Sequence, residues 1–165
     1  MRKTVSVLGI IIVLIWACSG SDKEKDALQA RIQALQQKLD SSYKPGLGEF
    51  MTAIQIHHAK LWFAGRYQNW KLADFEINEI KETLDDINRY CADRPEIQSL
   101  PMILPAFDSV SSSIKNQNSK SFQLSFTFLT NTCNNCHTAT KHGFNAIQIP
   151  EKPPFSNQDF RNPNP

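Results

Sequence analysis

The feature that most constrains the fold is an apolar stripe of helical period over residues 70–91. The stripe alternates strictly between spacings of three and four residues, at Trp70, Ala73, Ile77, Ile80, Leu84, Ile87 and Cys91. This spacing puts all seven side chains on one face of a helix. Six acidic residues lie largely outside the stripe and are expected to face solvent: Asp74, Glu76, Glu79, Glu82, Asp85 and Asp86. Such a helix is stable only when a partner covers its apolar face.

Three further segments carry stripes of the same period. Their apolar or stripe positions are Met51, Ile54, His58 and Leu61; Ile103, Phe107, Val110 and Ile114; and Phe122, Phe126, Leu129, Cys133 and Cys136. Pro105 suits the first turn of the third helix, and Gly143 is the expected stop of the last. Pro95 and Pro101 bound a predicted loop. No segment alternates with period two long enough to predict a sheet. We therefore predict an all-α protein whose core is an antiparallel four-helix bundle over residues 46–143.

Two segments flank the predicted bundle. Residues 26–40 place Leu28, Ile32, Leu35 and Leu39 at heptad spacing, which predicts a short extra helix, either a stalk or a helix lying on the domain. The C-terminal tail, residues 144–165, is rich in proline and is expected to be extended and irregular.

The N-terminus resembles an export signal. Arg2 and Lys3 precede an apolar run from Val5 to Ala17, which is shorter than the roughly 20 residues of a membrane span. Residues 1–17 are thus a predicted signal peptide. The run ends at Ala17-Cys18, which resembles the lipobox of bacterial lipoproteins, and residues 18–45 would then form a lipidated tether and the heptad helix. We expect a periplasmic protein anchored to a membrane through Cys18. The alternative is an ordinary signal peptide cut near Ala17.

The overall charge restricts the kind of partner. The formal net charge is +2, and it falls to zero once Arg2 and Lys3 are removed, because residues 1–17 contain no acid. Nucleic acid is therefore not an expected partner. The hydrophobic content of 41% is ordinary for a globular domain with a buried core.

The chemistry is concentrated in Cys133-Asn134-Asn135-Cys136-His137. A Cys-x-x-Cys-His sequence is the signature of c-type haem attachment. Positions i and i+3 lie on one helix face, so both thiols can reach the vinyl groups of one porphyrin. The adjacent imidazole then binds the iron from the proximal side. The prediction is one haem c per chain, held by Cys133 and Cys136 with His137 as the iron ligand. Covalent haem is attached on the exported side of bacterial membranes, which agrees with the predicted signal.

Zinc binding and disulfide formation are the two other uses of paired cysteines. A zinc site needs four ligands and could recruit only His142 beside the motif residues. A disulfide between Cys133 and Cys136 is allowed in an exported protein, but it leaves His137 unexplained. Cys91 completes the stripe of residues 70–91 and is expected to be a buried core thiol without chemistry.

The motif at the end of a fourth helix resembles the cytochrome c-prime and c-556 class. Residues 55–65 (QIHHAKLWFAG), 69–73 (NWKLA) and 153–160 (PPFSNQDF) are similar to a group of bacterial c-type cytochrome-like proteins. The resemblance covers about residues 46–160 and implies a four-helix bundle, haem binding and electron transfer. It identifies no redox partner.

The sixth iron ligand decides the expected function. The first predicted helix of the bundle offers Met51 and His58 on the face expected to meet the haem, and counting from the helix ends puts His137 level with about Met51. Either ligand would make the protein an electron carrier rather than an enzyme, whereas an open distal side would allow nitric oxide or carbon monoxide to bind. A structural lipoprotein without haem is the third alternative. His57 lies off the stripe and is expected to face solvent. Whether the chain forms a homodimer stays open.

Overall fold

The computed structural model describes residues 22–39, 41–42 and 44–161. Every regular element within these residues is a helix, which confirms the all-α prediction. The chain divides into two compact units between Lys44 and Pro45. The predicted signal peptide and Cys18 lie outside the described residues. Among the described helices, none has the length and apolar character needed to cross a membrane.

The described part of the first unit is a helix over residues 22–39 and a short turn, and the helix includes most of the predicted heptad segment. Its four apolar heptad positions are all more than half exposed: Leu28, Ile32, Leu35 and Leu39.

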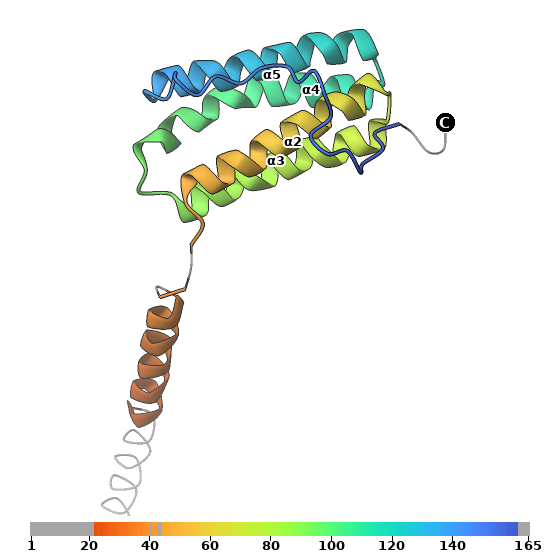
Figure 1. The fold of residues 1–165 in the computed structure, drawn as a ribbon. Helices are drawn as coiled ribbons and strands as arrows, with labels where there is room; N and C mark the ends of the chain where they lie inside the picture. Colours follow the sequence, from red (N-terminus) through yellow and green to blue (C-terminus); the bar gives the residue numbers. More distant parts are fainter. Residues whose placement is uncertain (1–21, 40, 43, 162–165) are drawn as a thin grey trace, which may run out of the picture. The chain divides into compact units, whose positions relative to one another are not determined.

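The second unit contains the other described helices. They are α2 (Leu47–Arg66), α3 (Trp70–Tyr90), the 3₁₀ helix η1 (Pro95–Ile103), α4 (Leu104–Lys115) and α5 (Ser119–Ala139). Figure 1 shows α2 beside α3 and α4 beside α5, and further contacts of α2 with α5 and of α3 with α4 join the two pairs. The side chains of Asn69 and Asn118 cap the starts of α3 and α5. The predicted loop between Pro95 and Pro101 is instead the helix η1, because proline suits the first turn of a helix and 3₁₀ turns serve as short connectors.

Aromatic packing fixes the register between α2 and α5. The Phe122 ring lies so close to Gly65 that a Cβ there would overlap it. One turn further along α5, the Phe126 ring lies 4.9 Å from that of Trp62. The next turn brings Thr130 Oγ1 within 2.9 Å of His58 Nε2. The residue numbers along α2 therefore fall as those of their partners along α5 rise, so the two helices run in opposite directions.

Glu76 and His57 were both expected to face solvent, and this prediction is wrong for both. The Glu76 side chain is completely buried, with Oε1 2.6 Å from Lys60 Nζ and Oε2 2.7 Å from His57 Nδ1. A carboxylate tolerates this burial because two donors on the neighbouring helix α2 pair with it. His57 is accordingly only 20% exposed. The stripe pattern missed this cluster because the pairing joins two helices.

The end of α5 also differs from the prediction. The helix ends at Ala139, and the left-handed residue that follows is Lys141, with φ 65°, rather than Gly143. The Lys141 amide donates to the Thr138 carbonyl and the His142 amide to the His137 carbonyl. These are the two hydrogen bonds of a Schellman cap, which satisfy carbonyls that the helix would otherwise leave unpaired.

The tail is irregular, as predicted, but it packs back onto the domain. Residues 144–161 contain no helix or strand. Figure 1 shows them running back along α5 and then towards the turn that joins α2 to α3. Phe160 is buried, with its ring 5.8 Å from that of Phe63. Asn69 Nδ2 donates to the Arg161 carbonyl at 3.2 Å. The tail is therefore part of the folded unit.

We predict that Gly65→Ala destabilises the protein by about 2 kcal/mol, because the added methyl group overlaps the buried Phe122 ring and outweighs the better helix propensity of alanine. Gly48→Ala is the matched control, since Gly48 is also in α2 and has no atom within 4 Å of an added Cβ. The control should be neutral or slightly stabilising. Urea unfolding measures both, and equal stabilities would contradict the proposed contact.

Candidate functional site

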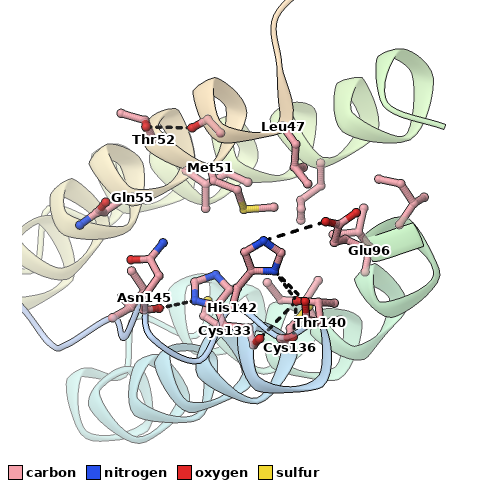
Figure 2. Close-up of a pocket in the computed structure, with 18 of the residues that line it drawn as sticks. Leu47, Met51, Thr52, Gln55, Glu96, Cys133, Cys136, Thr140, His142 and Asn145 are labelled. Carbon is pink, nitrogen blue, oxygen red and sulfur yellow. Dashed lines mark hydrogen bonds and ion pairs between the residues drawn. The ribbon is translucent and has the colours of Figure 1, made fainter. Parts of the chain in front are cut away.

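A cavity of about 270 Å³ lies between α2, η1 and the last turns of α5. Figure 2 shows Met51 on one side of this space, Cys133 and Cys136 on the other, and the His142 ring between them. Much of its wall is aliphatic: Leu47, Ile54, Leu84, Ile97, Leu100, Ile103 and Ile147. The five candidate residues of the domain all line it, namely Cys133, Cys136, His137, Met51 and His58. The fold thus brings together side chains that are up to 86 positions apart in the chain (137 − 51).

Cys133 and Cys136 are half-buried free thiols in the last two turns of α5. Burial raises the pKa of Cys133 to about 11, and it also raises the pKa of Cys136. Both groups are therefore neutral thiols near pH 7.

His137 has a fixed orientation at the cavity wall. Its Nδ1 lies 2.6 Å from the backbone carbonyl oxygen of Asn145. A carbonyl oxygen only accepts hydrogen bonds, so the proton is on Nδ1 and the lone pair of the neutral ring is on Nε2. A metal-binding imidazole commonly donates its other N–H to a carbonyl in this way. His137 is therefore prepared to bind a metal through Nε2.

His58 is held differently from His137. It is only 3% exposed, and its ring lies 4.5 Å from that of Phe126. The Thr130 hydroxyl donates to the Phe126 carbonyl, so His58 Nε2 carries the proton and donates to Thr130 Oγ1. Burial lowers the pKa of His58 to about 4. The ring is thus neutral, and Nε2 is engaged in a buried hydrogen bond.

Met51 presents a different kind of ligand atom. It is half-buried in the first half of α2, and Figure 2 shows its sulfur directed into the cavity. A thioether carries no proton, so it can bind a metal without breaking a hydrogen bond of its own. Of the two candidates for the sixth ligand, Met51 is therefore better able than His58 to bind a metal.

Polar residues at the start of η1 and after α5 complete the cavity lining. Arg94 donates to both carboxylate oxygens of Glu96, and these hydrogen bonds lower the pKa of Glu96. His142 lies with Nε2 4.0 Å from Glu96 Oε1, and its Nδ1 is 2.8 Å from the Thr140 carbonyl. The sequence had not indicated Arg94 or Glu96, because nothing local distinguishes them from ordinary loop charges.

The donor set suits a covalently attached haem. Within the described ranges, no three or more His, Cys, Asp or Glu side chains gather to hold a metal ion, so the four ligands of a zinc site are not assembled. A c-type haem asks less of the protein, because the porphyrin supplies four nitrogen ligands, one imidazole binds the iron and two thiols bond to the vinyl groups. Comparison with models of known families, curated proteins and solved structures finds no match.

In the haem-free protein, we predict that His58 makes stability depend on pH. Its pKa is about 4 when folded and 6.5 when unfolded, so the contribution is complete above pH 6.5 and is lost as the pH falls towards 4. The loss by pH 4 is about 3 kcal/mol. His58→Gln keeps a polar group but does not titrate, so its stability should fall less over this range. Urea unfolding at several pH values measures the difference, and parallel curves would contradict the prediction.

Proposed function

We propose that this chain is a single-haem c-type cytochrome that carries electrons on the periplasmic side of a bacterial membrane. Its fold would be the antiparallel four-helix bundle of the cytochrome c-prime and c-556 class. The observation that carries the proposal is the one cavity lined by Cys133, Cys136, His137 and Met51. These residues would supply two attachment points and two iron ligands for one haem.

Each part of the cavity has a role in this proposal. Cys133 and Cys136 would form the thioether bonds, and His137 Nε2 would bind the iron. Arg94 and His142 could donate to the haem carboxylates, and the aliphatic wall would cover the porphyrin and keep water from it. When bound, haem supplies a one-electron iron couple. The protein's own contribution is to orient the imidazole and to set the polarity of the cavity.

The register of α2 and α5 supports Met51 as the sixth ligand. The pairs Gly65–Phe122, Trp62–Phe126 and His58–Thr130 advance by about one turn on each helix. Two more turns of about 3.6 residues bring Met51 level with His137. A methionine ligand would leave the iron no open position for a gas, which favours electron transfer over gas binding.

The proposed location depends on residues outside the described ranges. The apolar run ending at Cys18 supports export and lipid attachment. A lipid anchor with the tether of residues 18–45 would keep the haem domain close to the membrane surface.

We predict that protein produced with the c-haem maturation machinery keeps its haem through denaturing electrophoresis. Replacing both Cys133 and Cys136 by serine should abolish haem staining, because no thioether bond remains. Cys91→Ser is the matched control, since Cys91 is buried in the core at the end of α3 and should leave the staining unchanged. A wild-type chain that does not stain would favour the structural lipoprotein without haem.

We also predict that Met51→Ala converts the haem from low spin to high spin and removes the weak near-infrared band of sulfur ligation. His58→Ala should leave that band in place, because the proposed ligand is intact. Absorption spectra of the oxidised proteins measure both effects. The reverse result would identify His58 as the sixth iron ligand. A wild-type spectrum that is already high-spin would favour the gas-binding alternative.

A further inference from the structure

We propose that Asn134, the first variable residue of the Cys-x-x-Cys-His motif, is a positioning residue for His137. It clamps the returning chain at Ile147, and the clamp holds the Asn145 carbonyl against His137 Nδ1. The inference rests on the proposed function, because it treats His137 as the iron ligand.

The clamp consists of two hydrogen bonds from one side chain. Asn134 Nδ2 donates to the Ile147 carbonyl at 2.9 Å, and the Ile147 amide donates to Asn134 Oδ1 at 2.8 Å. The carboxamide thus pairs with both backbone groups of Ile147, as a neighbouring strand would. Both bonds are partly buried, so water competes with them less than at an exposed site.

The clamp reaches His137 through two residues of backbone. Asn145 precedes Ile147 by two positions, and its amide donates to the His142 carbonyl at 2.8 Å. Segment 145–147 is therefore tied to the cap of α5 at one end and to Asn134 at the other. The Asn145 carbonyl between these ties accepts the His137 Nδ1 proton at 2.6 Å.

The residue type matters at this position. Asparagine carries one donor and one acceptor on a short stem, and the clamp uses both. Alanine would remove both bonds, and serine is too short to replace the pair. Asn135 is the same residue type at the next position, but it is exposed and lies outside the clamp. The two asparagines of the motif therefore have different roles.

The proposed consequence is electronic as well as structural. An imidazole that donates from Nδ1 to a carbonyl becomes a more basic ligand through Nε2. A more basic ligand stabilises ferric iron relative to ferrous iron and lowers the reduction potential. Loss of the clamp should loosen the Asn145 carbonyl, weaken this donation and raise the potential.

Haem-loaded wild type, Asn134→Ala and the control Asn135→Ala test the proposal. We expect Asn134→Ala to raise the midpoint potential, with Asn135→Ala close to wild type. Hydrogen exchange of the Ile147 amide reports on the clamp itself and should accelerate by roughly tenfold or more in Asn134→Ala only. If Asn134→Ala does not fold, Asn134→Ser takes its place with the same expected directions.

The outcomes separate this inference from the proposed function. Faster exchange at Ile147 with an unchanged potential would overturn the positioning role while leaving the cytochrome assignment intact. Unchanged exchange would overturn the clamp, whatever the potential does. A wild-type chain that takes up no haem would contradict the proposed function and with it the role of Asn134 towards an iron ligand.

Discussion

The Phe122 ring lies against the backbone of Gly65, and this contact sets how α2 and α5 meet. Any side chain at position 65 would push the two helices apart, because Phe122 is fully buried and cannot move into solvent. Trp62 and Phe126 continue the packing one turn further on, with ring centres 4.9 Å apart. Interiors packed in this way leave few voids into which a side chain could shift, and they transmit strain. The register is therefore fixed at one end of the domain and transmitted along rigid helices to the other.

The cavity depends on that register. Aromatic side chains fill the space between α2 and α5 near Gly65, whereas smaller and aliphatic side chains surround the space near Cys133 and Met51. His58 lies between the aromatic packing and the cavity, and its hydrogen bond to Thr130 joins α2 to α5 there. The wall beside His137 comes from the returning tail, which brings the Asn145 carbonyl to His137. A haem site built in this way would use the packed end for stability and the cavity end for chemistry.

Local sequence patterns predicted those features that depend on local spacing. The stripes located the helices, and the Cys-x-x-Cys-His motif located the thiols and imidazole on one helix face, because both signals depend on spacings of only a few residues. Features that depend on distant partners were missed. Glu76 was expected at the surface, but Lys60 and His57 on another helix allow its burial. The clamp at Asn134 could not be read from the motif, because its partner is the backbone of Ile147, which has no residue signature.

Helix ends show the same limit on a smaller scale. Gly143 is the better residue for a left-handed cap, yet the cap forms at Lys141, two residues earlier. The His142 amide then bonds to the His137 carbonyl, and the chain turns in time for Asn145 to reach the imidazole. Tertiary contacts of the tail thus outweigh the local preference, which is about 1 kcal/mol for glycine in this conformation.

The central claim is that Cys133 and Cys136 together hold one haem in the cavity between α2 and α5. Tandem mass spectrometry of tryptic peptides from the matured protein tests it most directly, since cleavage after Lys120 and Lys141 isolates residues 121–141 with both cysteines. We expect one haem on this peptide, bonded to both cysteines. An unmodified 121–141 peptide from a host competent for c-haem maturation would contradict it.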